Sequence, residues 1–177
     1  SDQVLKRMNR KVTGKKIIEK IERLRDYIPS IVLRTSVIVG FPGETQEDFE
    51  TLLQGIEQMK FDHLGVFKYS DEEGTPAFNL PNKLSQDVID ERFNQVYEIQ
   101  SQIAAEKNKT YLGKKLQVLV EGPHEDTDML IKARHAGQAP DIDGCVIIND
   151  GTAHAGDFVM VEVTDVIGFD LVAKIIK

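Results

Sequence analysis

The stretch from Ile31 to Thr45 constrains the fold of this chain most, because a strand there breaks into a Gly-Pro turn and then opens a helix. Residues 31–39 are largely aliphatic, and Gly40-Phe-Pro-Gly43 separates them from a Thr-Gln-Glu-Asp helix start. Polar residues at 34–36 interrupt the run, and a buried strand tolerates them only where something satisfies them. We therefore predict a βα unit whose strand contacts a ligand or a partner loop.

The composition predicts a soluble chain of one medium or two small domains, because its 177 residues are 41% hydrophobic and contain no apolar run of membrane-spanning length. No signal peptide is visible. A single cysteine, Cys145, excludes an intrachain disulfide and a multi-thiolate metal site within these residues, and it suits a reducing compartment. We expect a cytoplasmic monomer without membrane attachment, and the charged start at Ser1 leads us to expect a part of a longer chain.

The first two thirds of the sequence predict alternating helices and strands. Apolar positions at spacings of three and four predict a helix over 15–28 that Pro29 stops, and a second helix that Thr45 caps with Asp48. A short strand over 64–69 follows, so this order predicts a right-handed parallel βαβ unit within an α/β sheet or barrel. A turn-rich segment then leads to a long helix from Ser85 to near Gly113.

From Lys115 onward, the hydrophobic period changes to two and predicts short strands. Five such segments separated by polar turns indicate a small closed antiparallel β-barrel; they are 116–121, 128–133, 144–148, 158–164 and 170–176. We place a domain boundary after the long helix, with residues 1–112 in the first domain and 113–177 in the second.

The charges are divided unevenly between these domains. Residues 1–112 carry 16 Lys and Arg against 18 Asp and Glu, whereas residues 113–177 carry 6 against 11. An acidic surface repels phosphate backbones and attracts basic partners. The second domain therefore favours a basic protein partner over a nucleic acid.

Several residue strings resemble the radical S-adenosylmethionine (SAM) methylthiotransferase family. These are Ser1-Asp-Gln-Val-Leu-Lys-Arg-Met-Asn-Arg10, Leu33-Arg-Thr35, Ile38-Val-Gly-Phe-Pro-Gly-Glu-Thr45 and Tyr69-Ser-Asp-Glu-Glu-Gly-Thr75. The resemblance implies that residues 1–70 are the last third of a partial, TIM-like radical SAM barrel and that 113–177 are an OB-like TRAM domain.

Within this family, the strings at 69–77 and 133–144 are similar to the type that modifies an aspartate of the twelfth small-subunit ribosomal protein. The related type modifies adenosine in tRNA. Because residues 113–177 sum to a charge of −5, we favour the basic ribosomal protein as partner and tRNA less. Besides these two enzyme types, a third hypothesis for the function is a non-catalytic module that only recruits a partner.

The resemblance implies SAM and two [4Fe–4S] clusters as cofactors of the full-length enzyme. A radical derived from SAM would remove hydrogen from the aspartate β-carbon before the methylthio group is installed. The family's cluster cysteines lie upstream of this sequence, so we expect residues 1–177 to bind no cluster and to be inactive alone. Cys145 lies in an apolar strand, where we interpret it as a small buried hydrophobic residue.

The resemblance also implies residues that contact SAM. Ile38 would pack on the adenine, while Glu44 is spaced one residue later than the family pattern requires and is not assigned. Strand alternation would put Arg34 and Ser36 on the same side as Ile38. The full predicted SAM set is Arg34, Ser36, Ile38, Gly40, Phe67, Lys68 and Tyr69. The alternatives are an internal ion pair for Arg34 and a simple tight turn for 40–44.

Two polar segments are candidates for substrate recognition. The first, at the expected substrate entrance, comprises Asp71, Glu72 and Glu73; the second, on a loop of the barrel, comprises Arg134, Gln138, Asp141 and Asp143. The alternative for the first segment is a solvated turn, and the alternative for the second is a long turn with a purely structural role. The four histidines have no metal-binding spacing, so no metal ligand and no catalytic residue is assigned in this chain.

Overall fold

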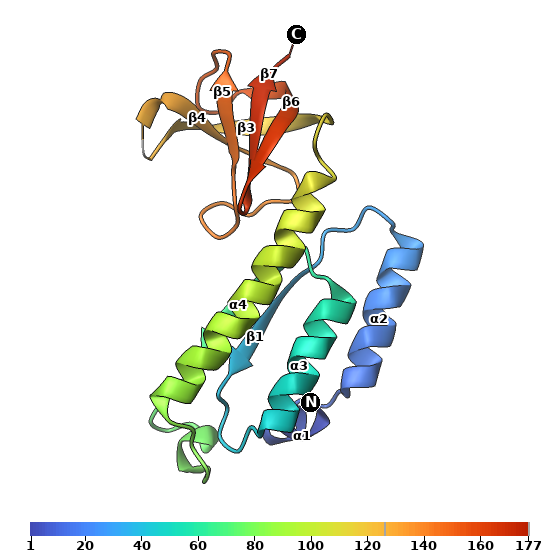
Figure 1. Ribbon diagram of the computed structural model, residues 1–177, viewed down its shortest axis with the longest axis vertical. Helices are drawn as coiled ribbons and strands as arrows, with labels where there is room; N and C mark the ends of the chain where they lie inside the picture. The colour runs from blue at the N-terminus through green and yellow to red at the C-terminus, as the bar shows by residue number, and fades with distance from the viewer. Residues whose placement is uncertain (126, 177) are drawn as a thin grey trace. The chain divides into compact units, whose positions relative to one another are not determined.

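The computed structural model describes residues 1–125 and 127–176, and it divides into two compact units, Ser1–Ile103 and Ala104–Lys177 (Figure 1). Each unit has its own hydrophobic core. The division by compactness falls within a long helix, and the limits expected from the sequence, 1–112 and 113–177, stay a prediction. None of the helices within the described ranges is long and apolar enough to cross a membrane.

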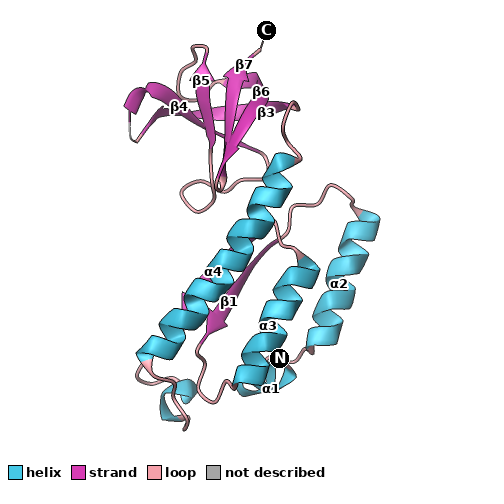
Figure 2. Cartoon of the chain, in the orientation of Figure 1, coloured by secondary structure: helices cyan, strands magenta, loops and turns pink. Residues whose placement is uncertain are grey.

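The first unit combines helices with strands (Figure 2), and its two strands pair in parallel, which confirms the predicted α/β character. Its elements are α1 (Asp2–Arg7), α2 (Gly14–Tyr27), β1 (Arg34–Val39), α3 (Gln46–Met59), β2 (His63–Lys68), a 3₁₀ helix η1 (Pro76–Asn79) and α4 (Gln86–Lys109). The last few residues of α4 belong to the second unit. Strand β1 begins three residues later than the sequence suggested. Just before the strand, Leu33 donates its N–H to the Asp62 carboxylate, and its carbonyl oxygen accepts the N–H groups of Asp62 and His63.

One face of the β1–β2 sheet is covered, and it forms the core of this unit. Val37 and Val39 from β1 and Leu64 and Val66 from β2 pack with residues of α3 and α4, including Phe49, Ile56, Ile89, Val96 and Ile103. Helix α3 begins as predicted, because Thr45 and Asp48 form a reciprocal capping box that satisfies orphan N–H groups of the first turn. The opposite face of the sheet carries the exposed residues of β1.

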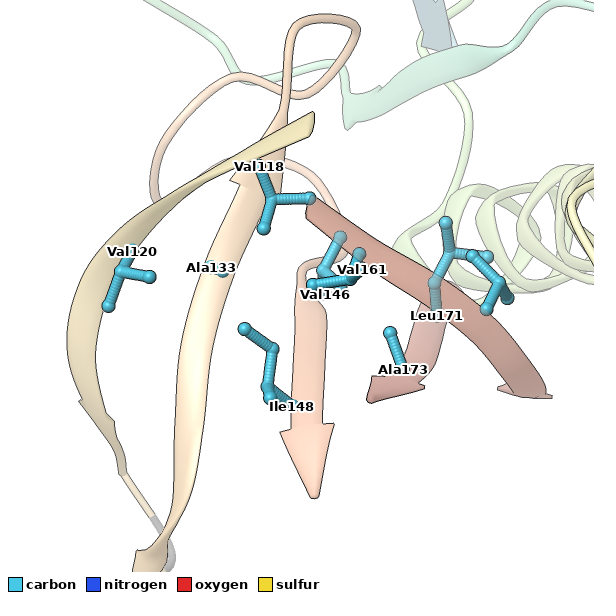
Figure 3. Close-up of a cluster of buried hydrophobic side chains, with 9 residues drawn as sticks. Val118, Val120, Ala133, Val146, Ile148, Val161, Leu171 and Ala173 are labelled. Carbon is cyan, nitrogen blue, oxygen red and sulfur yellow. The ribbon is translucent and has the colours of Figure 1, made fainter. Parts of the chain in front are cut away.

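The second unit is a closed five-stranded barrel, as predicted. Its strands are β3 (Lys115–His124), β4 (Thr127–His135), β5 (Val146–Asp150), β6 (Phe158–Ile167) and β7 (Asp170–Ile175), in the order β3-β4-β5-β7-β6. Inward-pointing side chains fill the interior, among them Val118, Val120, Ile148, Val161 and Leu171 (Figure 3).

One strand pair differs from the expected antiparallel barrel, because β5 and β7 run parallel. Strands β6 and β7 form a tight hairpin in which Ile167 pairs with Asp170. Closure then brings β7, and not β6, beside β5. The alternation of apolar residues fixes which side chains face inward but not the direction of the neighbouring strand, so the barrel is mixed.

Candidate functional site

The bare face of the β1–β2 sheet carries three of the predicted SAM residues. Arg34, Ser36 and Ile38 are the exposed residues of β1, and the residues between them are more buried. In the parallel register, Ser36 lies opposite Gly65 and Ile38 lies opposite Phe67. The common face expected from the sequence is therefore observed, while its role in binding SAM stays a prediction.

Gly65 allows the ring of Phe67 to lie close to the sheet. A Cβ atom on Gly65 would be 3.2 Å from the Phe67 ring and 3.4 Å from the Ser36 hydroxyl oxygen. Phe67 is 57% exposed and Ile38 is 41% exposed, so both offer apolar area to a ligand. This surface offers an aromatic and an aliphatic side chain side by side, and its contact with the adenine of SAM stays a prediction.

Arg34 lies at the other end of the same face. It opens β1 opposite His63, and Ile38 is four positions further along, which corresponds to about 13 Å along a strand. Ligands of open α/β sheets bind beyond the carboxyl ends of the strands. The structure thus brings Ser36, Ile38 and Phe67 together and leaves Arg34 at the amino end.

Gly40 follows β1 and allows α4 to approach the turn closely. It has a φ of +79°, and a Cβ atom there would lie only 2.5 Å from the Ile89 side chain. Its N–H donates to Oε1 of Glu44 at 3.0 Å. Gly40 consequently has a structural reason to be glycine, whether or not it also contacts a ligand.

A buried ion pair holds this turn against α4. Nη1 of Arg92 lies 2.5 Å from Oε1 of Glu44, and both side chains are almost completely buried. The Arg92 guanidinium also lies over the Phe49 ring at 5.0 Å. Sequence reasoning missed Arg92, although a lone arginine between Ile89 and Val96 on an apolar stripe could have indicated a buried partner.

The Lys68 side chain is turned away from the Ile38 face toward α4, and the Tyr69 side chain is held by its neighbours. The Lys68 ammonium pairs with Asp90 of α4 at 2.8 Å, and its hydrogen bond holds the pKa of Asp90 below its usual value. Tyr69 packs edge-on against Phe41 and donates its hydroxyl to Asp71 at 2.9 Å. A contact between SAM and Lys68 would therefore use the backbone of the strand.

The predicted acidic recognition segment lies on the exposed loop after β2. Asp71, Glu72 and Glu73 are all exposed. Lys83 pairs with Asp71 at 2.7 Å, and its hydrogen bond lowers the pKa of Asp71. The loop borders a cavity of about 410 Å³ that also contains Lys68. Because Lys83 neutralises Asp71, the acidity that this segment offers to a partner rests on Glu72 and Glu73.

The four predicted recognition residues of the barrel divide into two kinds. Gln138 is buried and accepts the His135 N–H at 3.0 Å, and Asp143 accepts the Ala139 N–H at 2.7 Å, so these two shape the loop. Arg134 is half-buried, and Asp141 is exposed. Arg134 pairs with Glu121 at 2.8 Å, and Asp141 lies 3.7 Å from the Lys132 ammonium.

The described residues do not fit an iron–sulfur cluster. Within 1–125 and 127–176, no three His, Cys, Asp or Glu side chains gather as metal ligands. Burial, and then the Asp170 carboxylate, raise the pKa of Cys145 to about 12, so its thiol is a poor ligand and nucleophile. That the cysteines which would hold the clusters lie upstream of residues 1–177 stays a prediction.

Comparison with known proteins relates the whole chain to one group. Residues 1–56 match the Radical SAM superfamily, and residues 112–176 match the TRAM domain. The relatives include the ribosomal protein uS12 methylthiotransferases RimO of Myxococcus xanthus (strain DK1622) and Geobacter sulfurreducens (strain ATCC 51573 / DSM 12127 / PCA), each 49% identical over all of this chain. RimO of Protochlamydia amoebophila (strain UWE25) is 43% identical over 99% of it.

The chain spans 37%, 40% and 38% of the lengths of these three relatives, so it corresponds to well under half of each. It carries a radical SAM segment followed by a TRAM domain, and identity near one half extends over both. The chain therefore belongs to the family of radical SAM proteins with a TRAM domain that RimO represents.

Proposed function

We propose that this chain is the C-terminal part of a methylthiotransferase that modifies an aspartate of the basic ribosomal protein uS12. The observation that carries the proposal is identity near one half along the whole chain to proteins named for that activity. In this proposal the first unit contributes a wall of the SAM site, and the barrel recognises the protein substrate.

The bare face of β1 and β2 supports the SAM part of this proposal. Ile38 and Phe67 would contact the adenine, with Ser36 beside them and the backbone at Lys68 and Tyr69 at the edge. When bound, SAM would supply the radical chemistry, while two [4Fe–4S] clusters would be held outside residues 1–177. The chain's own contribution is then to orient SAM and to exclude water.

The charge of the barrel supports the choice of a protein substrate. Lys132, Arg134 and Lys174 each pair with a carboxylate of the same unit, at distances of 2.8 to 3.3 Å. Cations engaged in this way neutralise few phosphates, and a nucleic-acid interface needs a basic surface. A basic ribosomal protein would instead be attracted by the net charge of −5.

Binding of the chain to recombinant uS12 and to a tRNA anticodon stem-loop, each at low and high salt, tests the partner. We expect uS12 to bind, more weakly at high salt, and the stem-loop not to bind. Tight, salt-sensitive binding of the stem-loop alone would instead favour a tRNA-modifying enzyme.

Equilibrium dialysis of the chain with SAM tests whether the exposed face of β1 and β2 binds SAM. We expect Ile38→Asp to weaken SAM binding, because it places a charge where the adenine would pack. Ile167→Asp, at an exposed isoleucine of β6, is the matched control and should leave SAM binding unchanged. Equal SAM affinity of the parent chain and Ile38→Asp would refute the assignment.

A further inference from the structure

The outer face of the barrel carries an apolar group that the sequence did not reveal. Val118 and Val120 point into the barrel (Figure 3), so Leu119 between them points outward. Leu119 lies directly opposite Phe158 of β6 on one side and Arg134 of β4 on the other. Met160 lies two residues beyond Phe158 on the same face, opposite Gln117.

Two of these three apolar side chains are exposed, and Leu119 is half-buried. Phe158 is 68% exposed and Met160 is 42% exposed, so a partner could bury most of the Phe158 ring. Opposed residues of an antiparallel pair are neighbours, which makes Leu119, Phe158 and Met160 one continuous patch across β3 and β6. We call these three residues the Phe158 patch.

Charged pairs border the Phe158 patch at both ends. At one end Arg134, the neighbour of Leu119, pairs with Glu121 at 2.8 Å. At the other end Glu162, two residues beyond Met160, lies opposite Lys115 and pairs with Lys174 at 3.3 Å. An apolar centre with a polar rim, containing an aromatic residue and an arginine, is the usual composition of a protein–protein hot spot.

The charges favour a basic protein as the occupant. Two of the three bordering cations, Arg134 and Lys174, already pair with carboxylates, and the barrel as a whole sums to a charge of −5, which repels a phosphate backbone. Long-range attraction by an acidic barrel would bring a basic protein close, and burial of apolar area would then hold it.

We propose that the Phe158 patch is the docking surface by which the barrel holds its basic protein substrate, with an apolar side chain of that protein packed on the Phe158 ring. This inference rests on the proposed function and adds the residues that make the contact. It assigns anchoring to β3 and β6, and it leaves Gln138 and Asp143 to shape the neighbouring loop.

The test compares uS12 binding by the full chain and two variants of β6. Phe158→Ser removes the anchor, and we expect uS12 affinity to fall about tenfold or more, as truncation of a hot-spot aromatic does. Ile167→Ser removes a similarly exposed apolar residue, 59% against 68% for Phe158, from the far end of the same strand and should change affinity less than about twofold. Thermal unfolding of each variant establishes that the barrel is folded. If Phe158→Ser fails to fold, Met160→Ser replaces it.

The outcomes separate the inference from the proposed function. Binding of uS12 by the parent chain with no loss in Phe158→Ser, or in the folded Met160→Ser that replaces it, overturns the inference alone. No binding by the parent chain overturns both the partner and the patch. A parent dimer in sedimentation that Phe158→Ser dissociates, or tRNA binding that this variant abolishes, would assign the patch to a different occupant and overturn the inference.

Discussion

Gly40 illustrates how one residue positions the end of β1. An alanine there would adopt a positive φ, at a cost of about 1–3 kcal/mol, and its methyl group would overlap Ile89. We expect Gly40→Ala to lower the free energy of unfolding in urea. Gly55→Ala, in the interior of α3, is the control and should raise stability by up to about 1 kcal/mol. A neutral Gly40→Ala would show that the turn relaxes freely.

Cys145 should be unreactive in the folded barrel. Burial and Asp170 raise the pKa of its thiol to about 12, so the thiolate is scarce at pH 8. We expect iodoacetamide to modify Cys145 slowly in the native chain and rapidly in urea. Because the folded pKa lies above the unfolded one, the thiol's contribution to stability is complete below about pH 8.5 and is lost as pH rises towards 12. Cys145→Ala should therefore lose less stability between about pH 8.5 and 12 than the parent chain. Equal rates of iodoacetamide modification in the native and the urea-unfolded chain would contradict this description of the thiol.

Individual side-chain roles were predictable only where a local pattern determines them. Alternation correctly put Arg34, Ser36 and Ile38 on one face. Burial of Gln138 depends on how its loop closes onto the His135 backbone, and no local pattern contains that information. The Arg92 contact with Glu44 joins residues 48 positions apart, so only the packed structure reveals it.

At the scale of elements, the ion pair between Arg92 and Glu44 docks α4 onto the turn after β1. Arg92→Met leaves the Glu44 carboxylate buried without its cation, which typically costs about 3–5 kcal/mol. In the double variant Glu44→Gln and Arg92→Met, a neutral amide oxygen can still accept the Gly40 N–H. Chemical denaturation should therefore show a recovery of stability from the single to the double variant. If the two are equally unstable, the loss comes from packing and not from charge.

Element types followed from the sequence more reliably than their pairing. The capping box at Thr45 and Asp48 is local, and the predicted helix start was therefore correct. The parallel β5–β7 pair depends on closure of the whole barrel, and period-two alternation is the same for either strand direction.

For the whole molecule, the two separate cores predict two cooperative unfolding units. Gly144 packs against the Phe169 backbone, and a Cβ atom there would lie 2.1 Å from the Phe169 carbonyl oxygen. We expect Gly144→Ala to accelerate hydrogen exchange throughout β3–β7 and to leave the amides of β1, β2 and α3 protected as before. Gly40→Ala should do the reverse. Equal loss of protection in both cores in either variant would mean that the chain unfolds as one unit.

The strand order of the barrel also determines when it can fold during synthesis. Strand β7, the last of the five along the chain, lies between β5 and β6 and not at an edge. While residues 170–175 remain inside the ribosome, β5 and β6 each expose an unpaired edge, and the inward-facing valines remain partly hydrated. The nascent barrel therefore passes through an open, aggregation-prone stage, which ends only when β7 is released and pairs with β5 and β6.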